Sequence, residues 1–412
     1  MNSLKASFAA IALAASSSPT VLAYTSQDGL FTVDSTQSSN MESWSNGKPV
    51  KLPQASSHSM NKLSRNVREQ LERPFIYLSG SNGSGRKVIP ANSGSAKYPY
   101  TTSLVEPPKM PKKKNKTKDI TTSGMPFLAT GKMHIKLGNG NYVCSGSLIG
   151  KGLVITAAHC LATWGSGASA KAKDVYFIPA ATSASNKNNA GPIGRWQAER
   201  VIVPGCYTAG TCSNLQSGVL SSNDVAMVVL KKTKGKLPSN KGAGKYGVAT
   251  SSYTFVDGSS YFNSSKIIGQ LTQLGYPAAI GAKNRLGAAM IRTDSMAQWA
   301  TFGDVRNFQW GSPQTGGSSG GPLLVNFGTD PTWGRGTGPG TLGQNSMNVV
   351  IGTTSYGNSS KRQGASRLGQ NKEFPESSYK DKGGKNWGPG NIGAFLRYVC
   401  GKGYLNLEKS HC

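Results

Sequence analysis

From about residue 120 to the C-terminus, short apolar segments alternate with turns rich in Gly, Asn and Ser. Many short strands spaced in this way, without intervening helical patterns, are typical of an antiparallel sandwich or barrel. The clearest helical pattern is terminal, over Ile392–Cys400. We therefore expect an all-β fold with a C-terminal helix. The predicted strands are Lys132–Leu137, Tyr142–Ile149, Leu153–Thr156, Val175–Pro179, Trp196–Val203, Val225–Leu230, Gln270–Gly275, Gly287–Arg292, Pro322–Val325 and Met347–Thr354.

The composition agrees with a turn-rich β protein. Charged residues make up 16% of the 412 positions, while Gly contributes 52, so long helices built from Glu, Lys and Leu are not expected. A lysine-rich stretch at Lys231–Lys245 divides the predicted strands into two comparable groups. We expect two β-subdomains in one unit, at about 122–235 and 246–400.

The N-terminus has the pattern of an export signal. Lys5 precedes the apolar run Phe8–Ala15, and Val21-Leu22-Ala23 places small residues where a signal peptidase reads them. We expect a signal peptide over 1–23 and a secreted, extracellular protein, with the periplasm as the alternative compartment. No other apolar run approaches the length of a membrane span, which excludes an integral membrane protein.

Export places the six cysteines in an oxidising compartment, where disulfides are expected. Fifteen pairings are possible. Because the cysteines fall into three groups of two that are close in sequence, we expect the local pairs, which are Cys144–Cys160, Cys206–Cys212 and Cys400–Cys412.

Residues 24–121 differ from the rest of the chain. They are rich in Ser, Asn and Pro, lack cysteine, and show little periodicity beyond a short helical pattern at Asn61–Glu72. The segment ends in Lys109–Lys118, a run with six lysines that must be solvated. Nuclear import or nucleic-acid binding is one interpretation of such a run. Behind an export signal, a protease-sensitive linker between a largely irregular pro-segment and a mature domain at 122–412 is favoured, with the mature start between Asp119 and Met125.

Of the four histidines, His159 has the most suggestive context. The apolar segment at 152–160 (GLVITAAHC) delivers it to a turn of small residues. A general base needs such fixed placement, because a small displacement costs a large factor in rate. His134 alternates within a strand pattern and is interpreted as structural, His58 lies in the N-terminal segment, and His411 lies beside the last cysteine.

Asp224 enters a segment that is otherwise almost wholly apolar, 222–230 (SNDVAMVVL). A carboxylate there is costly unless it meets a cation or a hydrogen-bond donor, and an imidazole that becomes charged during turnover would be a suitable partner. Capping a turn is the alternative role for Asp224. Asp257, in a turn-like context without a following apolar strand, is a second carboxylate that we rank lower.

The segment 316–322 (GGSSGGP) is followed by an apolar strand. Its glycines let the backbone turn tightly, expose a Ser hydroxyl and aim successive N–H groups at one point. A bare string of this composition is more often a linker. The proline and the strand that follow, together with His and Asp upstream in that order, favour a catalytic site.

The segments 156–160 (TAAHC), 224–226 (DVA) and 317–322 (GSSGGP) together resemble the three signatures of the trypsin/chymotrypsin-like serine peptidases. The resemblance extends over roughly residues 122–400. It implies a fold of two antiparallel six-stranded barrels with the site between them, in agreement with the two groups of predicted strands.

Mapped onto this sequence, the resemblance implies a catalytic role for three side chains. His159 would be the general base, Asp224 its orienting partner and Ser319 the nucleophile. The N–H groups of Gly317 and Ser319 would form the oxyanion hole, and the Cys144–Cys160 disulfide would lie behind the histidine.

Within the family, the segments 125–132 (MPFLATGK), 143–146 (VCSG) and 192–196 (PIGRW) are similar to the bacterial and fungal glutamyl-endopeptidase-like branch. Ser318 stands where trypsin-type zymogens carry the Asp that receives a freed N-terminal ammonium. Activation through that ion pair is therefore not expected, whereas removal of the pro-segment would act by uncovering the site.

The family binds the substrate side chain between residues just before the nucleophile and a later strand. Pro313 stands where an Arg/Lys-specific member carries Asp, and Thr354 lies in the region where a Glu-specific member carries His. We expect a polar, uncharged pocket for small or polar side chains, and an edge strand that pairs with the substrate backbone. The predicted substrate-binding residues are Gln314, Thr315, Thr354, Ser355, Tyr356 and Gly357.

The formal net charge of +28 favours acidic protein substrates or anionic surfaces, although it also serves solubility. There is no HExxH, Walker loop or CxxC motif, so no metal, cofactor or specific nucleic acid is expected. The sequence thus predicts a secreted serine endopeptidase, made as a pro-protein, that cleaves proteins or peptides. The alternatives are a non-catalytic homologue that acts as a basic binding or adhesion protein, and a polyanion binder that uses the lysine runs.

Overall fold

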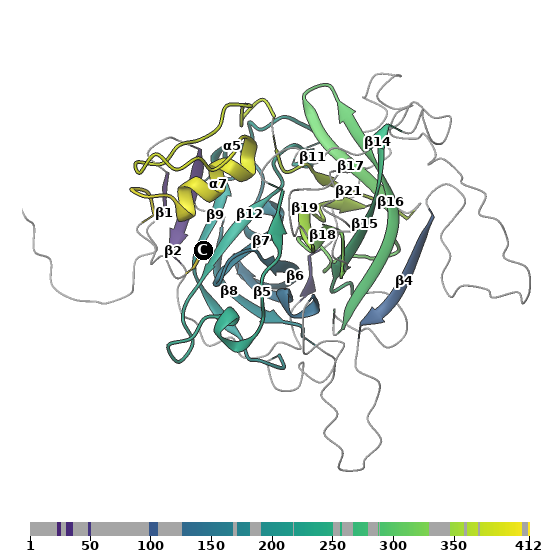
Figure 1. Ribbon diagram of the computed structural model, residues 1–412, viewed down its shortest axis with the longest axis horizontal. Helices are drawn as coiled ribbons and strands as arrows, with labels where there is room; N and C mark the ends of the chain where they lie inside the picture. Colours follow the sequence, from purple (N-terminus) through teal and green to yellow (C-terminus); the bar gives the residue numbers. More distant parts are fainter. Residues whose placement is uncertain are drawn as a thin grey trace, which may run out of the picture.

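Two β-barrels lie side by side in the computed structural model (Figure 1). The structure describes residues 23–25, 30–35, 48–50, 99–105, 126–167, 171–181, 191–216, 218–249, 256–257, 267–278, 287, 289–328, 347–357, 361–369, 371–405 and 411–412. No helix in this described part of the chain is long and apolar enough to cross a membrane. The predicted all-β fold class is confirmed.

The first barrel has six antiparallel strands in the order β9-β12-β7-β6-β5-β8, and the pairing of β8 with β9 closes it. Its interior is apolar because β7 and β12 are buried along their whole length. The strands are β5 (Thr130–Leu137), β6 (Gly140–Leu148), β7 (Leu153–Thr156), β8 (Ala172–Pro179), β9 (Trp196–Pro204) and β12 (Ala226–Leu230).

The second barrel follows the order β19-β18-β15-β16-β17-β21, and a bridge between Gly352 and Arg367 joins its two ends. Its strands are β15 (Ile267–Gly275), β16 (Met290–Phe302), β17 (Val305–Gly311), β18 (Pro322–Val325), β19 (Val349–Thr353) and β21 (Arg362–Ser366). Short strands extend this second sheet, namely β13 (Gly247–Val248), β14 (Val256–Asp257) and β20 (Tyr356–Gly357). Strands β10 (Asn214–Gln216) and β11 (Val219–Ser221) form a separate two-stranded hairpin.

Two strands of the second barrel were not predicted from the sequence, and a third was predicted with the wrong bounds. The strand predicted at Gly287–Arg292 in fact starts at Met290 and continues to Phe302. Strands β17 and β21 were not predicted, because their buried positions include Asn307, Gln309 and Gln363. Buried amides satisfied by other side chains leave no apolar alternation to read.

Helix α7 (Gly390–Cys400) confirms the predicted terminal helix. The remaining helical turns are short: α3 (Ala158–Leu161), α5 (Gly205–Ala209), η2 (Phe127–Ala129) and η3 (Pro238–Lys241). All three expected cysteine pairs are disulfides in the structure. Cys400–Cys412 ties the end of α7 to the C-terminus, so the short helix is held at both its apolar face and its last turn.

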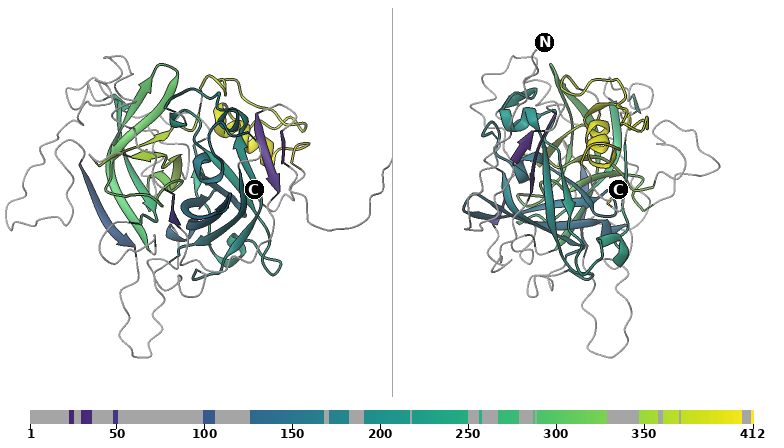
Figure 2. Two further views of the ribbon diagram at one scale, coloured as in Figure 1. Left: turned by 180° about the vertical axis from the view of Figure 1, so that it is seen from behind. Right: turned by 90° about the vertical axis from the view of Figure 1, so that its left-hand side faces the viewer.

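The N-terminal segment contributes four strands that were not predicted: β1 (Ala23–Thr25), β2 (Phe31–Ser35), β3 (Lys48–Pro49) and β4 (Tyr100–Val105). Strand β2 extends the first barrel along β9, and β4 pairs with β16 of the second barrel. Figure 2 shows β1 and β2 beside α7 and β4 at the far edge of the second barrel. The helical pattern at Asn61–Glu72 and the lysine run at Lys109–Lys118 lie outside the described residues.

Candidate active site

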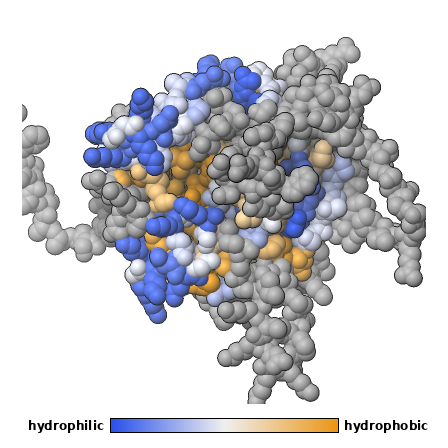
Figure 3. Space-filling model, in the orientation of Figure 1, coloured by the Kyte–Doolittle hydropathy of each residue, from blue (hydrophilic) through white to orange (hydrophobic). Residues whose placement is uncertain are grey.

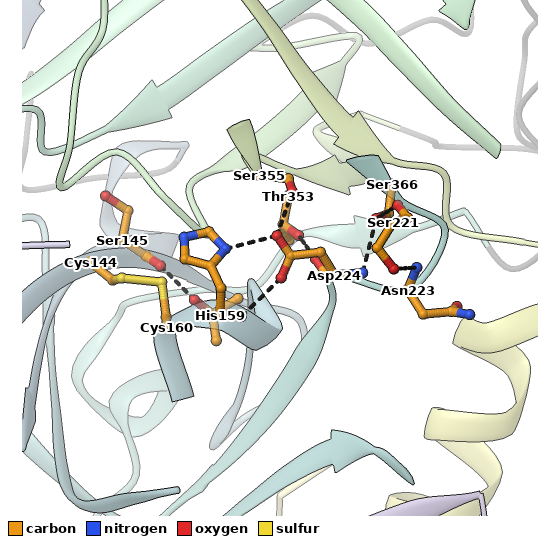
Figure 4. A network of polar contacts seen from close by, with 11 residues as sticks. Cys144, Ser145, His159, Cys160, Ser221, Asn223, Asp224, Thr353, Ser355 and Ser366 are labelled. Carbon is orange, nitrogen blue, oxygen red and sulfur yellow. Dashed lines mark hydrogen bonds and ion pairs between the residues drawn. A yellow bond between two sulfur atoms is a disulfide. The ribbon is translucent and has the colours of Figure 1, made fainter. Parts of the chain in front are cut away.

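His159 lies in the helical turn α3, directly after the buried strand β7. The disulfide between Cys160 and Cys144 fastens this turn to β6. The backbone N–H of His159 donates to Asp224 Oδ1 at 2.9 Å, and its Nδ1 lies 2.7 Å from Asp224 Oδ2 (Figure 4). Two bonds to one carboxylate fix both the position and the orientation of the imidazole, which is what a general base requires.

Asp224 is fully buried at the mouth of β12. Besides the two bonds to His159, its Oδ2 accepts a hydrogen bond from Ser355 Oγ. Its own backbone N–H donates to Ser366 Oγ at 2.9 Å, and that hydroxyl donates to Ser221 O at 2.6 Å. Burial of an ionised carboxylate is tolerated when it accepts several hydrogen bonds, so the second barrel helps to hold a carboxylate carried by the first.

A buried amide network supports the turn that carries Asp224. Asn223 Oδ1 accepts from the side chains of Asn371 at 2.9 Å and of Asn391, in α7, at 3.1 Å. Its Nδ2 donates to Glu373 Oε2 at 3.0 Å. The other oxygen of Glu373 accepts from the backbone and side chain of Ser213. The C-terminal region thereby fixes the residue next to Asp224, and none of these partners was identified from the sequence.

Ser319 lies in the glycine-rich turn before β18, where Gly317 and Gly320 have φ angles of +97° and +77°. Ser319 is fully buried, and within the described part of the chain its Oγ has no hydrogen-bond partner. The same holds for His159 Nε2, the ring nitrogen that faces away from Asp224. The predicted nucleophile and the predicted base thus each keep one side-chain atom without a hydrogen bond in the described part of the chain.

Ser145, in β6, links the glycine-rich turn to the rest of the site. Its Oγ donates to Gly317 O at 2.8 Å and accepts from Tyr276 N at 2.9 Å. Its backbone N–H donates to Ser319 O at 2.7 Å, and its carbonyl accepts from Thr156 Oγ1 at 2.8 Å. One buried residue therefore holds the carbonyls of Gly317 and Ser319, whose N–H groups are the predicted oxyanion donors.

The predicted donor Gly317 is engaged in this structure. Its N–H donates to the carbonyl of Val50, in the N-terminal segment, at 2.9 Å. The residue between the two predicted donors, Ser318, satisfies itself locally, since its Oγ donates to Thr315 O at 2.7 Å.

A model of one protein family, described as Trypsin, matches residues 121–368 of the chain. The chain belongs to the trypsin family. A comparison with curated proteins found no match.

Solved structures of trypsin-like proteases are similar to this trypsin-family chain. Protease Anisep from Arthrobacter nicotinovorans is 23% identical, with 59% of this chain and 90% of that chain covered and a TM-score of 0.40. The thermostable serine protease AL20 from an extremophilic microorganism is 22% identical, covering 58% and 91%, with a TM-score of 0.41. A Glu endopeptidase solved with MPD is 17% identical, covering 61% and 89%, with a TM-score of 0.39.

In this trypsin-family chain, five of the six predicted substrate-binding residues divide into two groups, and the sixth, Thr315, accepts a hydrogen bond from the Ser318 hydroxyl through its carbonyl. Gln314 and Thr354 belong to a buried polar cluster, in which Gln273 Nε2 donates to Thr354 Oγ1 at 2.9 Å and to Gln363 Oε1 at 2.7 Å. Gln363 in turn donates to the carbonyl of Gln314. Gln273 and Gln363 were missed because they lie on strands far from the nucleophile in sequence.

The second group lies along the strand that follows β19. Ser355 turns its hydroxyl to Asp224, so its side chain belongs to the carboxylate's surroundings, whereas the sequence analysis placed it in the substrate pocket. Tyr356 is buried in β20, and its hydroxyl accepts from Gln309 Nε2 at 3.1 Å. Gly357, the last residue of β20, pairs with Gln363 of β21.

The other candidates lie elsewhere in the molecule. Asp257 is in β14, paired with Ile267 at the edge of the second barrel, and the carboxylate on His159 is that of Asp224. His134 is buried in β5, and His411 Nε2 lies 3.0 Å from Leu230 O. His58 lies outside the described residues. Among the described residues, no group of His, Cys, Asp or Glu side chains could hold a metal ion.

Proposed function

We propose that the chain is a secreted serine endopeptidase, made as a pro-protein, that hydrolyses peptide bonds through an acyl-enzyme. The observation that carries the proposal is the pair of hydrogen bonds from His159 to the fully buried Asp224. They hold the imidazole in one orientation, and Nε2 carries no competing hydrogen bond in the described structure. Membership of the trypsin family and the unengaged hydroxyl of Ser319 support the same assignment.

In the proposed reaction, His159 Nε2 takes the proton of Ser319 Oγ as that oxygen bonds to the substrate carbonyl carbon. The N–H groups of Gly317 and Ser319 stabilise the negative carbonyl oxygen, and Asp224 stabilises the imidazolium. The imidazolium gives its proton to the leaving amine as the peptide bond breaks, which leaves an acyl ester on Ser319. His159 then deprotonates a water molecule as its oxygen bonds to the acyl carbon, and the imidazolium returns that proton to Ser319 Oγ as the ester bond breaks and the acid is released.

For specificity, we propose small or polar uncharged side chains. The support is that the buried amide cluster of Gln273, Gln314 and Gln363 beside Thr354 carries no formal charge, and that Gln314 Oε1 has no hydrogen-bond partner among the described residues. Secretion is proposed on the export-signal pattern of residues 1–23, and three disulfides agree with an oxidising compartment.

A second candidate function is binding to anionic surfaces without catalysis. The observation that favours it is a group of exposed lysines around the loop before α7 and just after it, within the hydrophilic margin at the α7 side of the molecule (Figure 3). These are Lys372, Lys380, Lys382, Lys385 and Lys402. Such binding would weaken steeply with salt.

The test is to incubate the processed protein, freed of its N-terminal fragment, with a mixed peptide library and to identify the cleaved bonds by mass spectrometry. Ser319→Ala removes the proposed nucleophile, and Ser318→Ala removes the neighbouring hydroxyl as a matched control. We expect the same cleaved bonds for wild type and Ser318→Ala, and none for Ser319→Ala. The absence of any cleavage by both folded proteins, wild type and Ser319→Ala, would favour the non-catalytic function.

A further inference from the structure

Three residues of the N-terminal segment, 48–50, lie between the two barrels at the catalytic turn. Strand β3 pairs in parallel with β6, with Lys48 opposite Tyr142 and Pro49 opposite Val143. The N–H of Val50 donates to Val143 O at 2.9 Å, and its carbonyl accepts from Gly317 N–H at 2.9 Å. The short purple strand between the barrels in Figure 1 is this segment. The backbone of Val50 therefore bridges β6 of the first barrel and the glycine-rich turn of the second.

This bridge competes with catalysis. An oxyanion hole works because its N–H groups are aimed at the oxygen where charge develops. The Gly317 N–H already holds the carbonyl of Val50, so it cannot serve a substrate in this arrangement. The edge of β6 at Val143 is also filled, although an exposed strand edge is where an extended peptide binds by backbone pairing. Ser319 itself is fully buried.

We propose that residues 48–50 form an autoinhibitory strap that keeps the full-length chain latent by occupying the Gly317 donor and the β6 edge. The proposal rests on the function proposed above, since it concerns regulation of that site. The hydrogen bonds of the strap are made by backbone atoms, since the Val50 N–H binds the first barrel and the Val50 carbonyl binds the turn of the second. The half-buried Val50 side chain also packs against the apolar core. The two hydrogen bonds themselves need only a residue with a backbone N–H at position 50.

The strap is anchored on both sides by strands of its own segment. Upstream, β2 pairs with β9 from Phe31 opposite Pro204 to Ser35 opposite Arg200. The ring of Phe31 is buried against Phe395 of α7, with centroids 4.4 Å apart. Downstream, β4 pairs with β16 from Tyr100 opposite Ser295 to Val105 opposite Met290. Both anchors raise the local concentration of residues 48–50 at the site.

The anchors have a consequence for maturation. A cut in the predicted linker, Lys109–Lys118, falls between β4 and the start of the first barrel. It breaks the covalent connection but leaves β2, β3 and β4 paired with the barrels. Linker cleavage alone therefore yields a nicked, still latent complex, and activity requires the N-terminal fragment to leave or to be cut near the strap.

The test measures how fast a fluorophosphonate probe labels Ser319, followed by intact mass. The chain carries a site for a sequence-specific protease inside Lys109–Lys118, so that uncut, nicked and fragment-free forms can be compared. We expect uncut and nicked forms to label at similar slow rates, with the fragment co-eluting in the nicked form. The fragment-free form should label at least about tenfold faster, the factor expected for the loss of about one net hydrogen bond.

Two substitutions in the uncut chain isolate the strap. Val50→Pro removes the N–H that binds Val143 O and should raise the labelling rate about tenfold. Val50→Ile keeps that N–H and should label like the uncut wild type. Equal labelling rates for uncut wild type, uncut Val50→Pro and fragment-free protein would overturn the strap while leaving Ser319 reactive.

Amide hydrogen exchange in Ser319→Ala protein gives a second readout that needs neither activity nor the Val50→Pro variant. The Gly317 N–H should be protected in the uncut and nicked forms and exchange faster once the fragment is removed. Unchanged exchange would contradict the strap. A folded, fragment-free wild type whose Ser319 never labels would instead contradict the proposed function, and the exchange result would still decide on the strap.

Discussion

The two halves of the candidate site differ in how far they are assembled. On the base side, His159 is held by two bonds to Asp224, and Asp224 is held by Ser355 and Ser366. On the nucleophile side, Ser319 Oγ is buried without a partner among the described residues, and the Gly317 donor holds Val50. Among the described residues, these hydrogen bonds of His159 and Asp224 come from the two barrels and the segments next to their strands, whereas the glycine-rich turn also contacts the N-terminal segment.

This difference indicates that regulation of the site acts on the Gly317 N–H and not on the buried Asp224 carboxylate. The buried carboxylate must be satisfied for the chain to fold, because an unpaired charge in the interior is costly. The Gly317 N–H is uncharged and donates to one backbone carbonyl of the N-terminal segment, so it can exchange that carbonyl for another at little cost. A latent form can therefore assemble the His159–Asp224 pair on folding, while the Gly317 N–H becomes free for a substrate only after the N-terminal segment leaves.

The largest expected effect comes from breaking the base side. Asp224→Asn keeps the shape of the side chain but removes the charge that stabilises the imidazolium, and should lower kcat of the processed protein about 10⁴-fold. Ser355→Ala removes one donor to the same carboxylate and should cost about tenfold. Steady-state hydrolysis of a peptide found in the library experiment measures both. Similar losses for the two variants would show that Asp224 acts only by packing.

A large effect is also expected from Gly320→Ala on the nucleophile side. A Cβ there would lie 2.0 Å from Thr156 Oγ1 and 2.4 Å from Ser145 O, so the turn must move. A shift of this size at the nucleophile should lower kcat by about 10²-fold or more. Gly303→Ala is the matched control, since Gly303 also has positive φ, +59°, but nothing lies within 4 Å of its added Cβ.

Gly303→Ala should cost about 1–2 kcal/mol of stability through its backbone alone and leave kcat unchanged. Urea unfolding and peptide hydrolysis of both variants separate the two effects. If Gly320→Ala kept full kcat, the contact between the glycine-rich turn and the His159-bearing segment would have no role in positioning.

Ser145→Ala should have a moderate effect that falls on the oxyanion hole. Loss of its hydroxyl leaves Gly317 O and Tyr276 N without their partner and loosens the donor turn. We expect kcat to fall about tenfold with KM unchanged. The affinity for a peptide boronate, which mimics the tetrahedral intermediate, should fall by the same factor. Ser147→Ala is the control, because the buried Ser147 hydroxyl has no partner among the described residues.

The smallest expected effect concerns the stability of the barrel that carries His159. Burial lowers the pKa of His134 well below 6.5, and the positive charges of Lys132 and Arg195 lower it further. Below pH 6.5, the His134 imidazole therefore binds a proton in the unfolded chain but not in the folded chain. The free energy of unfolding consequently decreases as the pH falls from 6.5. The loss has an upper limit of about 1.4 kcal/mol per pH unit. The free energy of unfolding can be measured with urea at several values between pH 7 and pH 5. It should fall less steeply with decreasing pH for His134→Gln than for wild type.

The sequence predicted the strands of the first barrel well, because they are apolar segments bounded by turns. One of them ends just before His159 and another begins just after Asp224, which drew attention to both residues. Fewer of the strands of the second barrel were predicted. Its site-facing strands bury Gln273, Gln309 and Gln363, and amides that satisfy one another look like loop residues in a linear pattern. Ser355 was placed in the pocket because the sequence does not show which way a strand-end side chain turns.

The N-terminal segment was the least predictable part. Strands β2 and β4 pair with barrel strands more than 150 residues away in sequence, and β3 pairs with β6, where Lys48 lies opposite Tyr142. Short strands whose partners are so distant carry no local turn signature. No feature of the sequence therefore predicts the contact of Val50 with Gly317.

The most direct test of the central claim is to trap the acyl-enzyme. The processed protein is mixed with a small activated ester, quenched in acid within the first turnover, digested and mapped by mass spectrometry. The account predicts one acyl group on the peptide that contains Ser319, and its absence in Ser319→Ala. Turnover of the ester with no acyl group at Ser319, or with the group on another residue, would contradict the assignment of Ser319 as the nucleophile.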